Sequence, residues 1–164
     1  MGRHPIAADR RYRARRSVKH AGWRQVGRRI ASECLAIRVR RLGRVITRIY
    51  DTALTPYGIS IAQVNLLAAI AVARGVRPTD LTQVLDVEKS TLSRDLKRME
   101  ELGWVRSGRT ARGRGRSLTL TPAGERLLVQ VGPAWEQAQQ VASAELGKQP
   151  FEQLRKLLSP FAPL

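Results

Sequence analysis

Residues 78–121 decide the fold, and they read PTDLTQVLDVEKSTLSRDLKRMEELGWVRSGRTARGRGRSLTLT. Pro78 is typical of the first turn of a helix, and the pattern after it predicts a short helix that ends before Asp86. A second helix is predicted over about residues 88–102, because apolar side chains recur there at helical spacing. Its buried stripe is expected to comprise Leu92, Leu96, Met99 and Leu102. Two short helices joined by a tight turn form a helix-turn-helix unit.

A β-hairpin is predicted after this unit. Residues 104–106 form a candidate strand, and residues 117–121 alternate between polar and apolar side chains, which is typical of a second strand. The ten residues between them, 107–116, contain four arginines, three glycines and no acid, so the hairpin should have a long cationic tip. A helix-turn-helix followed by such a hairpin is a winged helix. We therefore expect a mainly α fold with a small β-hairpin wing.

Amphipathic helices are predicted on both sides of the winged unit. One covers about residues 32–54 and should end before Thr55 and Pro56. Ser60 and Gln63 form a candidate capping box for a central apolar helix that Gly75 closes. The other flanking region covers about residues 122–162 and starts at the candidate cap Thr121, with a kink or break expected at Pro133 and an interruption at Gly147.

The charge of the chain is uneven. There are 30 Lys and Arg against 13 Asp and Glu, which gives a net charge of +17. Residues 1–30 hold ten basic residues and one acid, or +9, and show no sustained apolar period. We therefore predict a basic, flexible arm over residues 1–31 and one folded domain over residues 32–164, with the winged unit at about residues 60–121. The arm is open to three interpretations. It is a contact with phosphates or with a minor groove, a solvated tail or upstream sequence included by a wrongly assigned start, or a transit peptide.

Several function classes are not supported. The only two histidines, His4 and His20, lie in the arm, Cys34 is the only cysteine, and there is no nucleophile motif or phosphate-binding loop. We therefore expect neither an enzyme nor a metal site nor a cofactor. No apolar run is long enough for a membrane span, so a cytoplasmic, nucleoid-associated protein is expected.

The outward face of the second helix of the unit is a candidate surface for reading duplex DNA. It combines small hydroxyl side chains near its start with cations further along, which suits entry into a major groove. The wing arginines can reach a neighbouring groove or the backbone. The candidate DNA-binding residues are Ser90, Thr91, Ser93, Arg94, Lys97 and Arg98 on the helix and Arg112, Arg114 and Arg116 in the wing.

Large apolar faces lie at both ends of the domain. Pairing of two copies would bury them and would place two reading helices about one DNA turn apart. Packing within a single chain is the alternative. The candidate interface residues of a homodimer are Leu35, Trp135, Leu146, Phe151, Leu154 and Leu158.

The order of these elements resembles the MarR (multiple antibiotic resistance regulator) family of transcriptional regulators, over about residues 33–160. The segments that carry the resemblance are CLAIRVRRLGRVITRIYDTAL, GISIAQVNLLAAI, VEKSTLSRDLKRMEELGWV and LTLTPAGERLL. The resemblance implies an obligate dimer formed by the first and last helices, binding to a palindromic operator, and repression that is relieved by a small ligand or an oxidant. It also implies DNA contacts by Ser90, Thr91, Ser93, Arg94 and Lys97 on the helix and by Arg114 in the wing.

Two positions depart from the family pattern. The wing has Arg112 where the family usually has an aspartate, which predicts a more mobile and more cationic wing. The turn has Asp86 where family members often have glycine, and aspartate tolerates left-handed geometry. Cys34 lies where peroxide-sensing relatives carry a reactive cysteine, so redox sensing is one alternative. Two others are a basic nucleoid or RNA-binding protein and a module that binds other proteins.

Overall fold

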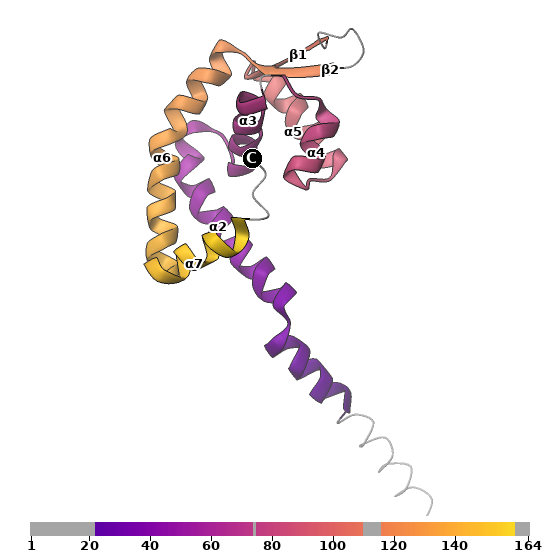
Figure 1. Cartoon of the computed structure of the whole chain (residues 1–164), viewed down its shortest axis with the longest axis vertical. Helices are drawn as coiled ribbons and strands as arrows, with labels where there is room; N and C mark the ends of the chain where they lie inside the picture. The colour runs from indigo at the N-terminus through magenta and orange to yellow at the C-terminus, as the bar shows by residue number, and fades with distance from the viewer. Residues whose placement is uncertain (1–21, 74, 110–115, 160–164) are drawn as a thin grey trace, which may run out of the picture. The chain divides into compact units, whose positions relative to one another are not determined.

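A computed structural model describes residues 22–73, 75–109 and 116–159 of the chain. The chain divides into two compact units, Met1–Val45 and Ile46–Leu164. This boundary falls inside a helix, whereas the sequence analysis placed the start of the folded domain at residue 32. The candidate DNA-reading elements all belong to the second unit (Figure 1).

The described part of the first unit is helical and exposed. One helix spans residues 22–33, the backbone is interrupted at Cys34, and helix α2 then begins, Leu35–Leu54. The final ten residues of the predicted flexible arm, 22–31, are therefore in regular structure, which the sequence analysis did not expect. The segment holds three arginines and one alanine, which favour a helix, against two glycines, which do not, and all its side chains are exposed. Residues 1–21 lie outside the described residues.

The connection from α2 to the central helix follows the predicted signals. Helix α2 ends at Leu54, and the short 3-10 helix η1, Thr55–Tyr57, leads into a left-handed Gly58. The capping box is confirmed, because the Gln63 N–H donates to Ser60 Oγ at 3.3 Å and the Ser60 N–H donates to Gln63 Oε1 at 3.2 Å. These bonds fix the start of α3, Ile61–Ala73.

The helix-turn-helix unit consists of α4, Pro78–Leu85, and α5, Lys89–Glu101. Asp86 joins them with φ of 48°, and no other non-glycine residue in the described part of the chain has a positive φ. Leu92, Leu96 and Met99 are buried as predicted. Leu102 is not: it is exposed, because it follows the last helical residue and the left-handed Gly103 turns the chain away.

The wing is a two-stranded antiparallel sheet of β1, Val105–Arg109, and β2, Arg116–Leu120. Val105 pairs with Leu120 at one end of the ladder and Arg109 with Arg116 at the other. A backbone bridge also joins β2 to Val76, whose N–H and C=O both bond to Leu118 at 3.2 and 2.8 Å. The wing is thereby attached to the segment that enters α4.

Helices α6, Pro122–Leu146, and α7, Lys148–Leu158, complete the chain. Thr121 caps α6 as predicted, since its Oγ1 accepts the Gly124 N–H at 3.1 Å. The break that we expected as one outcome at Pro133 does not occur, and α6 is continuous through it. Pro133 removes the usual donor to the carbonyl of Val129, but both residues are exposed, so water can bond to that carbonyl.

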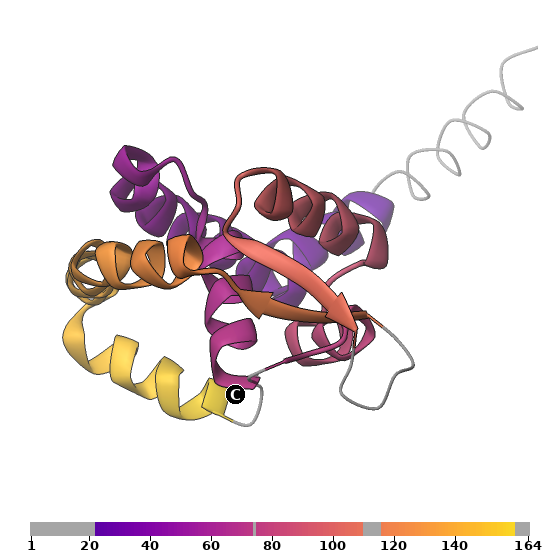
Figure 2. The same cartoon turned by 90° about the horizontal axis from the view of Figure 1, so that it is seen from above.

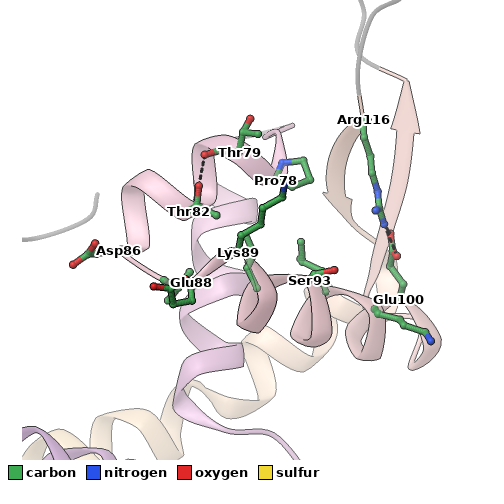
Figure 3. Close-up of a pocket in the computed structure, with 13 residues that line it drawn as sticks. Pro78, Thr79, Thr82, Asp86, Glu88, Lys89, Ser93, Glu100 and Arg116 are labelled. Carbon is green, nitrogen blue, oxygen red and sulfur yellow. Dashed lines mark hydrogen bonds and ion pairs between the residues drawn. The ribbon is translucent and has the colours of Figure 1, made fainter.

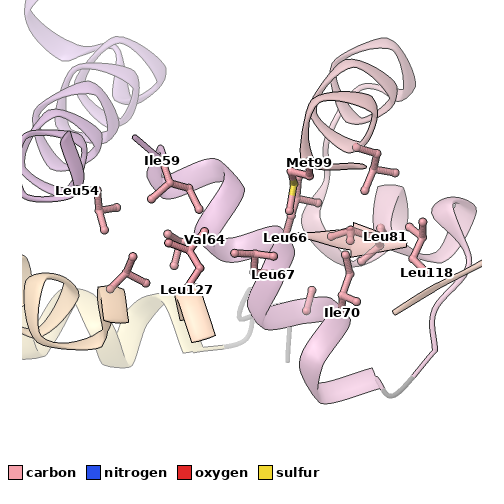
Figure 4. Packing of buried hydrophobic residues seen from close by; sticks show 14 of the residues in the cluster. Leu54, Ile59, Val64, Leu66, Leu67, Ile70, Leu81, Met99, Leu118 and Leu127 are labelled. Carbon is pink, nitrogen blue, oxygen red and sulfur yellow. The ribbon is translucent and has the colours of Figure 1, made fainter. Parts of the chain in front are cut away.

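The core of the second unit is built around α3. In Figures 1 and 2, α6 lies on one side of α3 and the pair α4 and α5 on the other, with the hairpin across one end. The buried cluster draws on every one of these elements and on the end of α2, and it includes Leu54, Leu67, Ile70, Leu81, Met99, Leu118 and Leu127 (Figure 4). The apolar surface that this cluster removes from water is the main stabilising contribution, and it fixes α5 and the wing relative to α3.

Among the described residues, no single helix is long and apolar enough to cross a membrane. One bent pair of helices within the described ranges, Leu35–Tyr57 and Ile61–Ala73, is long and apolar enough when taken together, and α3 in this pair is the core helix.

Candidate nucleic-acid interface

The outer face of α5 carries the six predicted helix residues. Their spacing places them within one arc of the helix, opposite the buried Leu92, Leu96 and Met99. All six are exposed, and Arg94 Nη2 lies 3.4 Å from Thr91 Oγ1 as a donor. Lys97 Nζ lies 3.8 Å from Glu101 in an exposed pair that salt screens. This face therefore presents hydroxyls and cations with little internal neutralisation: Ser90, Thr91, Ser93, Arg94, Lys97 and Arg98.

Of the three predicted wing arginines, Arg116 is the one that lies among the described residues. Arg112 and Arg114 lie outside the described residues, so their contacts remain predictions. Arg106, on β1, donates from Nε to Thr119 Oγ1 across the hairpin at 3.2 Å. Arg116 is exposed at the start of β2, but its guanidinium is bound within the protein.

Glu100 is the partner of Arg116. Nη2 of Arg116 lies 2.6 Å from each oxygen of the Glu100 carboxylate. Ser107, on β1, accepts from Arg116 Nε at 2.5 Å and donates its hydroxyl proton to Glu100 Oε1. Three elements, α5, β1 and β2, thus meet in one cluster of polar side chains. We call Glu100, Ser107 and Arg116 the wing-root cluster.

Glu100 and Ser107 were not among the residues predicted from the sequence. The position of Glu100 in the last turn of the predicted helix was one signal. An acid there lies at the negative end of the helix dipole, so a nearby cation would stabilise it. The cation that pairs with Glu100 could not be identified from the sequence, because residues 107–116 hold four arginines and the register of the hairpin was not known.

The environment of Glu100 alters its acidity. Burial alone raises the pKa of Glu100, but the hydrogen bonds from Arg116 and Ser107 and the charge of Arg116 outweigh this and leave the pKa lowered. The carboxylate form is therefore stabilised in the folded protein.

This lowered pKa predicts a pH dependence of stability. A group with a lowered folded-state pKa stabilises the protein above its unfolded pKa of about 4.3, and this contribution is lost as the pH falls through the folded value. At about pH 7 we expect Glu100→Gln to lower the free energy of unfolding by about 1 kcal/mol, a value that allows for screening of the exposed arginine. Urea titrations of both proteins should show this difference shrinking towards about pH 3. A difference of unchanged size in acid would contradict the assignment.

A groove of about 800 Å³ lies between α4, α5 and the wing root (Figure 3). Its lining includes Thr82 from α4, Ser93 and Lys97 from α5, and the pair Glu100 and Arg116. Ser93 is thus shared between this groove and the outer face of α5. The family resemblance implied a ligand between the dimerisation helices and the winged unit, and that pocket remains a prediction.

The remaining candidates lie outside this surface. Cys34 is half-buried at the interruption before α2, and its N–H donates to the Ile30 carbonyl at 3.0 Å. Its redox role stays a prediction. Leu35, Trp135 and Leu158 are exposed at 72%, 38% and 48%, which leaves apolar surface available for a partner. The other three candidate interface residues are half-buried: Leu146, Phe151 and Leu154.

Comparisons with known proteins agree with this geometry. A family model described as MarR family matches residues 57–117. A cysteine-to-serine mutant of MarR from Escherichia coli, solved in complex with operator DNA, is similar at a TM-score of 0.70 with 26% identity, covering 80% of this chain and 96% of that one. Wild-type apo MarR from the same organism is similar at a TM-score of 0.66 with 26% identity, covering 77% of this chain and 95% of that one.

A probable transcriptional regulator from Pseudomonas aeruginosa has the same fold, with a TM-score of 0.71, 19% identity, and 79% and 98% of the two chains covered. No curated protein matches the sequence significantly.

Proposed function

The chain belongs to the MarR family of winged-helix transcriptional regulators, and from this premise we propose that it binds a specific double-stranded DNA operator as a homodimer. The observation that carries the proposal is the outer face of α5, which is cationic, exposed and fixed from behind by the core. The related Escherichia coli protein was solved with operator DNA, which supports the same class of partner here.

The side chains of this face suit direct reading of bases. Ser90 and Thr91 are short, so the start of α5 can approach the base edges closely. Arg94 follows one turn later and can donate two hydrogen bonds to a guanine in the major groove. Lys97 and Arg98 lie further along, where cations can neutralise phosphates. The helix thus combines groups that select a sequence with groups that only attract the backbone.

The proposal of a dimer follows from uncovered apolar surface. Leu158 on α7 and Trp135 on α6 keep 48% and 38% of their surface exposed, although both are large and apolar. A second copy that covers them would form an isologous interface with two-fold symmetry. Two α5 helices would then face two half-sites, which requires a palindromic operator.

Replacing Leu158 by glutamate should convert the dimer to monomer. The residue is exposed, so the fold of one chain should tolerate the change, whereas a buried carboxylate in an interface is strongly unfavourable. Sedimentation equilibrium at micromolar concentration should show at least about a hundredfold weaker association. Val129→Glu is the matched control, since Val129 is exposed on α6 and is not a candidate interface residue. A Leu158 variant that stays fully dimeric would contradict this interface.

We further propose that the protein acts as a repressor and that a small ligand releases it from DNA. The family supports this mode of regulation. The identity of the ligand is open, and oxidation of Cys34 is the competing signal. Operator affinity measured before and after mild peroxide, in wild type and in Cys34→Ser, separates the two: loss of binding in the wild type alone supports the thiol, and equal loss in both excludes it.

The function is tested by selecting DNA from a random pool with the wild-type protein. We expect an enriched sequence with two-fold symmetry, whose half-sites have centres about 34–36 Å apart along the duplex. Recovery of unrelated sequences without symmetry would instead indicate the alternative function, a basic nucleoid or RNA-binding protein.

A further inference from the structure

The wing-root cluster lies where the hairpin leaves the body of the winged unit. Arg116 is the first residue of β2 and pairs with Arg109, the last residue of β1. Ser107 pairs with Leu118, so these two side chains and that of Arg116 project from the same face of the hairpin. Leu118 is fully buried, which identifies this face as the one that packs on the body of the unit.

Glu100 connects this face of the hairpin to α5. It lies in the last turn of α5, where the negative end of the helix dipole disfavours a carboxylate. The Glu100 side chain is 25% exposed, against 63% for the neighbouring Glu101. A carboxylate that has lost this much hydration needs compensating donors, and Arg116 and Ser107 supply them.

The same bonds occupy two of the three guanidinium nitrogens of Arg116, whose side chain is 51% exposed. Nη2 is shared between both oxygens of the Glu100 carboxylate, and Nε donates to Ser107. A phosphate that took Nη2 or Nε would break these bonds and leave Glu100 unpaired close to a polyanion. Glu100 would then lose its cation, which is unfavourable for a carboxylate of reduced hydration.

We propose that Glu100, Ser107 and Arg116 hold the wing at a set angle to α5, so that Arg116 is a positioning residue rather than a DNA contact. If α5 and the wing enter adjacent grooves, the two elements must keep a constant relative orientation. A wing that is already oriented loses less conformational entropy when DNA binds. The part of this inference that concerns DNA rests on the proposed function, and the part that concerns the wing does not.

The first test uses the DNA-free protein and follows amide hydrogen exchange in β1 and β2. Glu100→Gln keeps the shape of the side chain and removes its charge. We expect exchange in both strands to become about tenfold faster, because charge-assisted hydrogen bonds are lost. Glu101→Gln is the matched control: it removes the same charge one residue away, from an exposed pair with Lys97, and should leave exchange unchanged. Amides of α6 should not change in either variant.

The second test measures binding to a duplex selected by the wild-type protein, at one salt concentration. We expect Glu100→Gln and Arg116→Gln each to bind about tenfold more weakly, whereas Glu101→Gln should bind equally well or more tightly because an acid is removed. The double variant Glu100→Arg with Arg116→Glu restores the pair with its charges exchanged. It should recover most of the wild-type affinity.

The outcomes separate the two roles of Arg116. If Arg116 contacted phosphate, Glu100→Gln would release it and strengthen binding, and the exchanged pair would bind worst of all. Either result overturns the proposal, as does unchanged amide exchange in Glu100→Gln. If the wild type shows no preference for the selected duplex, the proposed function fails, while the exchange experiment still decides whether the cluster positions the wing.

Discussion

Replacing Gly124 by alanine is expected to destabilise the winged unit by about 3 kcal/mol, the upper part of the usual range for overpacking. A Cβ atom at this position would lie 2.1 Å from the carbonyl oxygen and 2.9 Å from the carbonyl carbon of Trp104. Both atoms belong to the backbone, so no rotation of a side chain can relieve the clash. The Trp104 carbonyl also accepts the Thr121 N–H at 3.0 Å, so moving it disturbs the junction between β2 and α6.

The control for this variant is Gly43→Ala in the interior of α2. Apart from its chain neighbours and the backbone of its own helix, no atom lies within 4 Å of a Cβ built at Gly43, and alanine favours a helix over glycine. We expect this change to leave stability unchanged or to raise it by about 0.5–1 kcal/mol. Chemical denaturation of both variants and the wild type gives the comparison. Equal stability of the two variants would show that the close approach at Trp104 is not a constraint.

Replacing Arg94 by alanine is expected to weaken binding to the selected duplex by about 10- to 100-fold, which corresponds to one bidentate contact with a base. The loss should depend on sequence: substitutions at the base pair that Arg94 reads should no longer matter to the variant. Binding to random DNA should fall much less, because only one phosphate-attracting charge is removed.

Arg155→Ala is the matched control for the loss of charge. Arg155 is exposed on α7, outside the winged unit, and lies 3.5 Å from Glu152. Titrations of both variants against selected and random duplexes, repeated over a range of salt concentrations, separate base reading from simple attraction. If Arg94→Ala lost affinity equally for both duplexes, Arg94 would be a backbone contact and the proposed reading role would be wrong.

Most of the fold could be predicted because its signals are local. The capping box at Ser60 and Gln63, the cap at Thr121 and the left-handed turn at Asp86 each depend on residues within one turn of the chain. The alternation of residues 117–121 likewise identified the second strand. Such patterns are set by backbone hydrogen bonding and by the periods of helix and strand, which do not require knowledge of distant contacts.

The features that could not be predicted depend on contacts across the fold. Glu100 and Arg116 are sixteen residues apart, and only the hairpin register brings them together. Gly124 lies in the first turn of α6, where glycine is normally unfavourable. The reason for it is the backbone carbonyl of Trp104, which leaves no room for a Cβ atom. Leu102 follows the apolar period, yet the turn at Gly103 exposes it.

The outer face of α5 is the surface that we propose to read a specific DNA sequence. The most direct test of this proposal is a competition experiment at fixed salt between the selected duplex and a shuffled duplex of the same length and composition. We expect the wild-type protein to bind the selected duplex at least about 10³-fold more tightly than the shuffled one. A ratio near one would contradict the proposal, because attraction by net charge would then explain all of the binding.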